Sequence, residues 1–270
     1  MLRKASESER NQILAYCSAE PSINLFIIGD IELYGFDKEF QEVWVQNLDV
    51  APTELTGVVL RYHQNFIIYG KDKIVMEEIV QLMATYPVSL ISGKSSVIQK
   101  LYPFVDTKFD LRALNFAELC SDALLYQSSE DVQVADVNDA VAIATAYDFI
   151  SEFEMLYPGG FDLRLKQISN RISSGEGTHM FIRKDGVVIS HGNTAAETSV
   201  SAMIGGVMTI EGYRRQHYSS KVVSALCKRL LDQGKRACLF YSGEACTNLF
   251  HKLGFKEIDQ WLILGGKKNE

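Results

Sequence analysis

The residues best placed to do chemistry are Arg214 and Arg215, which lie on a short polar connection just before an amphipathic segment. A helix N-terminus carries unpaired backbone N–H groups and the positive end of the helix dipole. Phosphate groups bind at such ends, and arginine side chains add charge-assisted hydrogen bonds. These residues therefore indicate a phosphate-binding site. The alternative is an ordinary connection with solvated arginines, since a local motif without its context is weak evidence.

The segment 203–231 supplies the elements that must position these arginines. Residues 203–209 form an apolar run, which predicts a strand, and residues 211–217 form a polar connection. After them, apolar side chains recur at three- and four-residue steps, which predicts a helix with one buried face. Those side chains are Val222, Val223, Leu226, Leu230 and Leu231. The sequence thus predicts a strand, a basic loop and a helix in direct succession.

Composition limits the class of protein. The chain has 270 residues, 47% hydrophobic and 23% charged, typical of a globular protein with one large or two modest domains. Its net charge of -7 disfavours nonspecific nucleic-acid binding. The five cysteines include no CxxC pair, which predicts free thiols in a reducing compartment and no metal site. No segment has the length of a membrane span and the N-terminus is polar, so we expect a cytoplasmic protein without a membrane partner.

Periodicity and turn residues predict two halves with the same order of elements. Each half has helices, antiparallel strands, a long helix, a strand, a short helix and a strand. Periodicity is lost over 121–131, so we place a boundary near Ser128 and expect domains 1–127 and 128–270. Asp185-Gly186 predicts a hairpin turn between two strands. The predicted helices are 6–18, 21–34, 73–86, 95–102, 140–149, 162–173, 218–233 and 245–252. The predicted strands are 40–47, 56–62, 65–69, 88–92, 109–119, 132–134, 179–183, 187–191, 200–209, 237–241 and 255–264.

Three blocks of the second half resemble the GCN5-related N-acetyltransferase (GNAT) superfamily. They are VMT at 207–209, YRRQHYS at 213–219 and NLFHKLGF at 248–255. The resemblance covers roughly residues 132–264. The first half is similar to the degenerate, non-catalytic copy of double-domain members in element order alone. The resemblance implies an α+β fold, in which a GNAT-like mixed sheet flanked by helices follows an N-terminal α/β domain of similar topology.

The resemblance also implies where acetyl-CoA binds. The strand ending at Thr209 would splay from strand 237–241, and main-chain groups of Val207 and Thr209 would pair with the pantetheine arm. The N–H of Met208 would point at the thioester oxygen. Asn248 would also bind pantetheine, next to Phe250. The pyrophosphate would lie against the loop and helix start, at Arg214, Arg215, Gln216, His217, Tyr218, Ser219 and Ser220.

Two residues depart from the family pattern. His217 stands where the family prefers glycine, so we expect it to keep right-handed helical geometry with its ring turned outward, or to contact phosphate through its imidazole. Phe250 stands where many members have a tyrosine that protonates the leaving thiolate. Since a CoA thiol has a pKa not far above that of cysteine, near 8.5, the thiolate can leave without that acid. Replacement donors are Cys246, Tyr241, His251 and Tyr218.

The acceptor amine must lose a proton, which requires a base. Glu197, near the start of the strand ending at Thr209, and Glu154, in the segment expected beside the pocket, are the candidate catalytic carboxylates. Each is alternatively a solvated side chain. His191 is a further candidate base. Tyr157 and Phe161 are expected to line the acceptor pocket.

These observations predict an acyl-CoA-dependent N-acyltransferase, most simply an acetyltransferase that transfers the acyl group directly to an amine. Its substrates are acetyl-CoA and an amine acceptor that the sequence does not identify. Two alternatives stay open: a module that binds acyl-CoA without turnover, and a purely structural domain. The sequence does not decide between a monomer and a homodimer.

Overall fold

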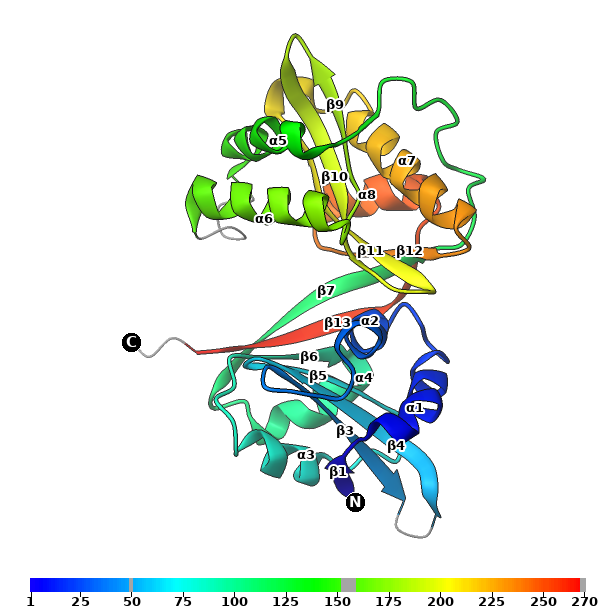
Figure 1. The fold of residues 1–270 in the computed structure, drawn as a ribbon, viewed down its shortest axis with the longest axis vertical. Helices are drawn as coiled ribbons and strands as arrows, with labels where there is room; N and C mark the ends of the chain where they lie inside the picture. The colour runs from blue at the N-terminus through cyan, green and yellow to red at the C-terminus, as the bar shows by residue number, and fades with distance from the viewer. Residues whose placement is uncertain (49–50, 152–158, 268–270) are drawn as a thin grey trace. The chain divides into compact units, whose positions relative to one another are not determined.

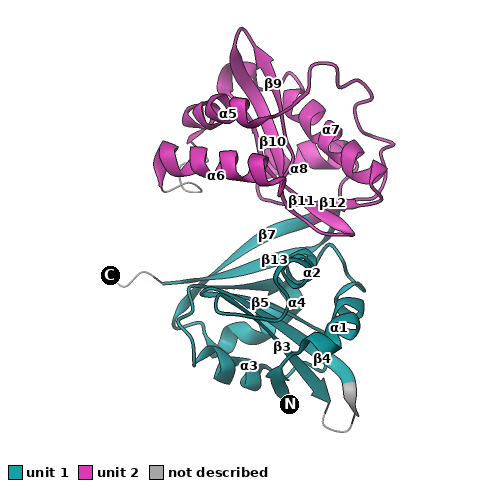
Figure 2. Cartoon of the chain, in the orientation of Figure 1, with its two compact units in different colours: residues 1–116, 257–270 teal, residues 117–256 magenta. Residues whose placement is uncertain are grey.

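The computed structural model describes residues 1–48, 51–151 and 159–267. The chain folds into two compact units (Figure 2). Unit 1 comprises Met1–Phe116 with Glu257–Glu270, and unit 2 comprises Ala117–Lys256. Each unit is a mixed sheet with helices packed on it (Figure 1). The predicted α+β class is therefore confirmed.

Unit 1 is built on a sheet with the strand order β1-β3-β4-β5-β6-β13-β7, to which β2 adds at β3. The pairs are antiparallel where the register is described, except that β5 and β6 are parallel. The strands are β1 (Leu2–Lys4), β2 (Asp37–Lys38), β3 (Gln41–Leu48), β4 (Ala51–Tyr62), β5 (Asn65–Gly70), β6 (Leu90–Lys94), β7 (Phe109–Leu119) and β13 (Lys256–Gly266). The helices are α1 (Arg10–Cys17), α2 (Leu25–Tyr34), α3 (Met76–Met83) and α4 (Ser95–Leu101).

Unit 2 continues from the end of β7 with the order β12-β11-β10-β9-β8. The pair β11–β12 is parallel, and the pairs from β11 to β8 are antiparallel. The strands are β8 (Gln133–Val134), β9 (His179–Lys184), β10 (Val187–Glu197), β11 (Ser201–Thr209) and β12 (Arg236–Tyr241). The helices are α5 (Ala140–Ala146), α6 (Gly160–Ser174), α7 (Tyr218–Asp232) and α8 (Glu244–Lys252).

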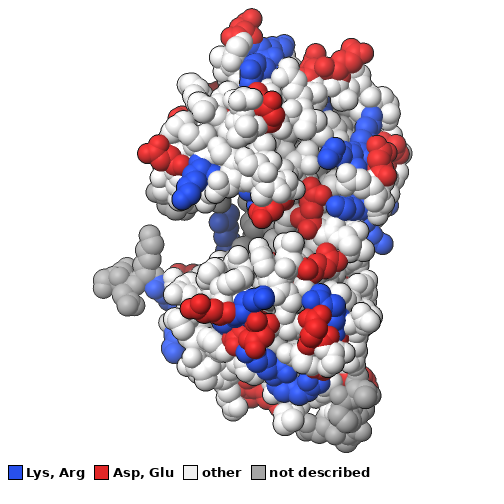
Figure 3. Space-filling model, viewed as in Figure 1, with Lys and Arg blue, Asp and Glu red and all other residues white. Residues whose placement is uncertain are grey.

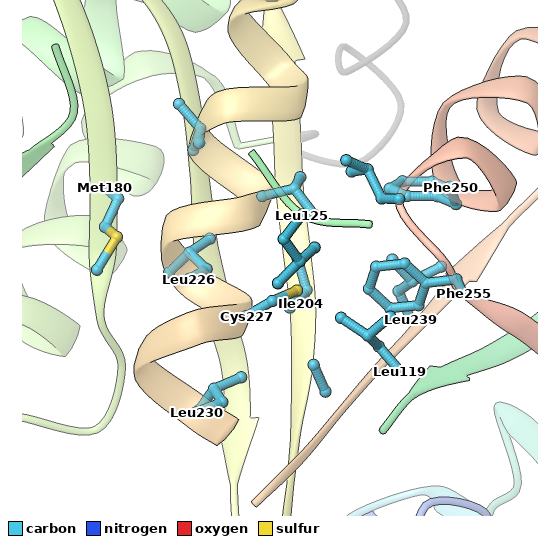
Figure 4. Close-up of a cluster of buried hydrophobic side chains, with 14 of the residues drawn as sticks. Leu119, Leu125, Met180, Ile204, Leu226, Cys227, Leu230, Leu239, Phe250 and Phe255 are labelled. Carbon is cyan, nitrogen blue, oxygen red and sulfur yellow. The ribbon is translucent and has the colours of Figure 1, made fainter. Parts of the chain in front are cut away.

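Alternating side chains give the sheet of unit 2 two buried faces. Phe181 and Val188 pack with α5 and α6 on one face. Met180, Ile182 and Ile189 pack with α7 on the other. Figure 4 shows the side of α7 that carries Leu226, Cys227 and Leu230 turned toward this second cluster, with Ile204 and Leu239 from the strands. The predicted amphipathic helix is confirmed, and its buried face fixes the loop before it.

The compact units differ from the predicted domains 1–127 and 128–270 at both ends. Ala117 and Leu119 pack into the core around α7, so unit 2 begins before the irregular segment in which Ser128 lies. The last strand was expected in the second domain. Instead Trp261–Gly265 of β13 pair antiparallel with Leu90–Lys94 of β6, in the sheet of unit 1. Pairing between distant strands decides which unit the last strand joins, and local periodicity carries no information about that pairing.

None of the described helices combines the length and hydrophobicity that a membrane crossing needs. The described residues also contain no group of three or more His, Cys, Asp or Glu side chains that could hold a metal ion. On the face of the molecule in Figure 3, basic and acidic side chains are intermixed. All five cysteines are free thiols.

We expect Leu226→Ala to lower the free energy of unfolding by about 2–5 kcal/mol, because Leu226 is fully buried under α7 and its truncation leaves a cavity. Urea unfolding measures this change. Arg229→Ala, on the exposed side of the same helix, is the control and should change stability by less than about 0.5 kcal/mol. Equal effects of the two substitutions would contradict the packing described for α7.

Candidate functional site

The central feature of unit 2 is the point at which β11 and β12 separate. The described part of their parallel ladder joins residues 201–203 to residues 236–238 and ends there. Beyond it opens a groove of about 520 Å³, which we call the strand groove. It is lined by residues 204–209 of β11, residues 239–241 of β12 and part of α8. Backbone groups on separated strand edges can pair with an extended ligand, as an added strand would.

Gly206 forms a bulge in the wall of this groove. The β10–β11 register shifts here, so that β11 carries one residue more than β10, and Gly206 has a φ of 59°. A Cβ at this position would lie 2.3 Å from Asn193 Oδ1 and 2.5 Å from the Tyr147 hydroxyl. Both the backbone conformation and the available space therefore require glycine. The bulge changes the direction of the backbone groups that follow it.

Val207, Met208 and Thr209 all line the strand groove, as the sequence predicts for residues that contact acyl-CoA. The side chain of Met208 is buried in the core with α5 and α6, and Met208 is paired with His191 of β10. Contrary to the sequence prediction, the structure therefore does not turn the Met208 N–H into the groove. Thr209 Oγ1 donates to Ser190 Oγ at 2.9 Å and lies 2.6 Å from Ser219 Oγ in α7. These hydroxyl contacts fix the end of β11 against the first turn of α7.

A second cavity of about 360 Å³, which we call the loop cavity, lies at the connection between β11 and α7. It shares several lining residues with the strand groove, so the two spaces are contiguous. The shared residues are Thr209, Arg214, Ser219, Ala245 and Leu249. An extended ligand in the strand groove would therefore reach the start of α7 with its far end.

Two residues of this connection adopt left-handed backbone geometry. Arg215 and His217 each have a φ of 63°, and His217 is the N-cap of α7. The expectation that His217 keeps right-handed geometry is therefore wrong: it takes the conformation that glycine favours, while its imidazole is exposed. Its side chain makes no capping hydrogen bond. The first N–H groups of α7 thus have no side-chain acceptor at the cap, and left-handed residues in such a turn direct successive N–H groups toward one point.

The loop cavity is positively charged. Arg214, Arg215 and Lys252 line it, and the described lining residues include no carboxylate. Arg214 Nε donates to the carbonyl of Thr209 at 3.0 Å, which holds this arginine against the end of β11. Arg215 is exposed, and no ion pair of its side chain occurs within the described part of the chain. Backbone N–H groups and cationic side chains of this kind are the groups that bind anions in proteins.

The other predicted cofactor-binding residues of this region are mostly at the loop cavity. Tyr218, Ser219, Ser220 and the exposed Asn248 line it, whereas Gln216 does not. The Tyr218 hydroxyl accepts a hydrogen bond from Lys184, whose ammonium lies 4.7 Å from the centre of the Tyr218 ring. Tyr218 does not line the strand groove, so the structure does not bring it to the position expected for the leaving sulfur.

Phe250 and Tyr241 lie together in the strand groove. The Phe250 ring is buried, with its centre 5.4 Å from that of Tyr241 and 5.7 Å from that of Phe255. The Tyr241 hydroxyl lies 3.2 Å from His251 Nε2. Cys246 also lines the groove, and burial raises the pKa of its thiol. Of the four predicted replacement acids, the structure therefore brings Tyr241 and Cys246 into the groove and places His251 behind Tyr241.

The structure does not bring the candidate base Glu197 to the groove. Glu197 is opposite Ala202, where β11 is still paired with β12. Its carboxylate accepts hydrogen bonds from Thr194 Oγ1 at 2.7 Å and from Lys235 Nζ at 3.0 Å. These contacts give the carboxylate of Glu197 a structural role in holding β10 to the start of β12. Glu154 and Tyr157 lie outside the described residues.

His191 and Phe161 also lie away from the groove. His191 is fully buried, and its ring nitrogens contact the Tyr147 hydroxyl at 2.9 Å and His179 Nδ1 at 3.0 Å. Burial, together with the neighbouring His179, lowers the pKa of His191 to about 3. It therefore cannot touch an acceptor amine directly. Phe161 is half-buried under the guanidinium of Arg164 in the α5–α6 core.

Some lining residues were not predicted from the sequence. They are Ile150, Ile204, Gly205, Gly206, Leu239, Phe240, Ser242, Ala245, Leu249 and Lys252. Most are apolar residues of strands or helices, which carry no chemical signal of their own. Lys252 is the exception, because it is a cation within the NLFHKLGF block and could have been predicted as a phosphate-binding residue.

Comparison with known proteins concerns the fold. The family model described as FR47-like protein matches residues 190–263. No curated protein matches the sequence. Among solved structures, an acetyltransferase of the GNAT family from Colwellia psychrerythraea has a TM-score of 0.59 at 14% identity, covering 99% of this chain and 100% of the other.

Two further structures align over nearly the whole chain. A tandem GNAT protein from the clavulanic acid biosynthesis pathway has a TM-score of 0.59 at 10% identity and covers 100% of this chain and 99% of the other. A Drosophila protein has a TM-score of 0.69 at 9% identity with the same coverage. The predicted resemblance to double-domain GNAT proteins is confirmed for the fold.

We expect His217→Val to lower the free energy of unfolding by about 1–2 kcal/mol, because a β-branched side chain is strained at a φ of 63°. His217→Gly should be tolerated, since glycine adopts this conformation without strain. Thermal or urea unfolding of both variants measures the difference. If valine and glycine had the same effect, the left-handed cap would be refuted.

Proposed function

We propose that this chain, which has the tandem GNAT fold, is an acyl-CoA-dependent N-acyltransferase, most simply an acetyltransferase. The observation that carries the proposal is the continuity of two spaces. The strand groove offers unpaired strand edges, and the loop cavity offers helix N–H groups with two arginines and a lysine. A ligand that is extended at one end and phosphorylated at the other matches both.

The described residues fit CoA in their chemistry. Main-chain groups of Val207 and Thr209 are available to the amides of a pantetheine arm, because β12 does not pair with β11 at this height. The backbone N–H groups of residues 215–220 and the side chain of Arg215 would hold the phosphates. Asn248 lies at the wall of the loop cavity, where it would hydrogen-bond the arm. When bound, acetyl-CoA supplies an activated acyl thioester.

The chain's own residues would serve two steps of the transfer. A main-chain N–H of β11 that faces the strand groove, at Val207 or Thr209, would stabilise negative charge on the thioester oxygen. Met208 is paired with His191 of β10, and its N–H is directed to that strand. The hydroxyl of Tyr241 would hold a proton at the position of the leaving sulfur, with His251 orienting it. Tyr241 thereby replaces the tyrosine that is absent at Phe250. Glu154 stays a candidate base: it follows Ile150, which lines the groove.

The acyl acceptor is an amine whose identity the site does not define. We further propose a cytoplasmic location, which the five free thiols support because reducing compartments preserve them.

Arg215→Ala should weaken CoA binding by about threefold to tenfold, since it removes an exposed charge-assisted contact to phosphate. Calorimetry measures the dissociation constant. Pantetheine, which lacks phosphates, should bind both proteins equally, and Arg229→Ala on the far end of α7 should leave CoA binding unchanged. Unchanged CoA affinity in Arg215→Ala would remove the phosphate assignment.

Tyr241→Phe should lower kcat by at least about tenfold and leave the KM for acetyl-CoA nearly unchanged, because a general acid acts on the leaving group rather than on binding. Release of free CoA thiol over a panel of amines measures the rate. Phe250→Tyr in the Tyr241→Phe background should restore part of it. Binding of acetyl-CoA without thiol release for any amine would instead support a module that binds acyl-CoA without turnover.

A further inference from the structure

Unit 2 contains a third cavity, of about 450 Å³, between α6 and the strands β9 and β10. We call it the α6 cavity. It has no lining residue in common with the strand groove or the loop cavity. Its volume is in the range of small-molecule sites and far above that of a single water molecule, about 30 Å³. It is lined by Tyr147, Gln167, Ile168, Asn170, Arg171, His179, Asn193 and Ala195.

Two buried nitrogen atoms that have no hydrogen-bond partner belong to residues of this cavity. They are Arg171 Nε and His179 Nε2. His179 is only 3% exposed, and its other nitrogen, Nδ1, is taken up by His191 at 3.0 Å. Arg171 Nη2 donates to the carbonyls of Thr194 at 2.9 Å and Ala195 at 2.7 Å and lies 3.5 Å from that of Glu176, whereas Nε–H has no acceptor among the described residues. Buried polar atoms are rarely left unpaired, so two in one cavity indicate a ligand.

The charge of the cavity has one sign. Arg171 is the single cation among the described lining residues, and they include no carboxylate. His179 is neutral near pH 7, because burial and the nearby charge of Arg171 lower its pKa to about 4. The remaining polar groups are the phenol of Tyr147 and carboxamides, which are neutral. An anion is therefore the occupant that this lining favours.

A chain of hydrogen bonds lets His179 present a donor to such an anion. The Tyr147 hydroxyl lies 2.8 Å from the carbonyl of Gly206 and 2.9 Å from His191 Nδ1, which itself lies 3.2 Å from the same carbonyl, so the hydroxyl can donate to either. When it donates to His191, that histidine carries its proton on Nε2 and donates to His179 Nδ1. His179 then carries its own proton on Nε2, the nitrogen that has no hydrogen-bond partner in the part of the protein that the structure describes. Two N–H donors, from Arg171 and His179, would thus converge on the occupant.

We propose that the α6 cavity binds the carboxylate group of a small molecule. Arg171 would pair with the carboxylate through Nε–H, as guanidinium groups do with planar carboxylates, and His179 Nε2–H would supply the second hydrogen bond. The exposed Gln167 and Asn170 lie at the mouth and would contact the rest of the molecule.

The carboxylate has two possible sources. It is either that of the amine acceptor, an alternative that rests on the proposed function, or that of a separate effector. Both sources are compatible with the position of the cavity, because Tyr147 and Asn193 belong to its lining and also pack against Gly206, which itself lines the strand groove. An occupant would thus contact the same side chains that hold the bulge.

Calorimetry on the full chain, without CoA, tests the site. The probes are glycine, L-alanine and L-glutamate, each with its amide, and the amine-free acids acetate and succinate. We expect at least one of these acids to bind. The corresponding amide, which for the amine-free acids is acetamide or succinamide, should bind at least about tenfold more weakly. The double variant Gln167→Glu with Asn170→Asp, which we call the mouth variant, adds negative charge at the exposed mouth of the cavity. It should bind the acid at least about tenfold more weakly than the wild type does.

Ser173→Asp, an equally exposed position of α6 outside the cavity, is the matched control and should bind as the wild type does. Arg171→Lys keeps the charge but removes the Nε donor, and should also weaken the acid. Its folding must be checked by circular dichroism, because Arg171 supports two carbonyls of β10. The mouth variant keeps the test decisive if Arg171→Lys unfolds.

Acids that bind no more tightly than their amides, or equally well to the mouth variant, would overturn the proposal. Acetylation of the bound amino acid identifies the acceptor as the source, and binding of an amine-free acid identifies an effector; either result supports the carboxylate site. A separate titration with CoA tests the acyltransferase proposal. If CoA does not bind while an acid does, the acyltransferase proposal fails and the carboxylate site stands.

Discussion

The site depends on one constraint: β11 and β12 are paired over residues 201–203 and 236–238 and then separate. A parallel pair that continued to Thr209 would use the backbone groups of both strands and close the strand groove. Separation leaves main-chain groups on β11 that are free to pair with an extended ligand. The side chains can then serve the core, as Met208 does. Because the main chain faces the groove and the side chains pack in the core, β11 needs few chemically distinctive side chains.

The bulge at Gly206 is maintained from the opposite face of the sheet. Tyr147, His191 and His179 form a buried hydrogen-bonded chain that ends on the carbonyl of Gly206 at one side and in the α6 cavity at the other. Burial keeps both histidines neutral, so the chain carries no net charge through the core. The strand groove and the α6 cavity are therefore joined by one polar network, although they have no lining residue in common.

The connection before α7 adopts left-handed backbone geometry at two residues that are not glycine. Arg215 and His217 have the left-handed backbone that glycine adopts most readily. Contacts around them hold this conformation: Arg214 bonds the carbonyl of Thr209, and Thr209 bonds Ser219 in the first turn of the helix. Because phosphate would be bound by backbone N–H groups, the conformation matters more than the side chain at position 217, provided that the imidazole stays exposed.

The sequence by itself determined the local elements. The spacing of Val222, Leu226 and Leu230 predicted α7. Asp185-Gly186 predicted the hairpin between β9 and β10, where both residues have a positive φ. The strand, basic loop and helix of the candidate site were predictable for the same reason, since helix and turn signals lie within a few residues of one another.

Tertiary structure alone decided which distant segments meet. It placed β13 beside β6, paired Glu197 with Lys235 away from the groove, buried His191, and brought Tyr241 and His251 together next to Phe250. It also assembled the α6 cavity from a helix and two strands. A sequence period states which face of an element is buried, but it does not state what covers that face or which strand edge pairs with which. Those choices are made by packing and by hydrogen bonding between segments far apart in the chain.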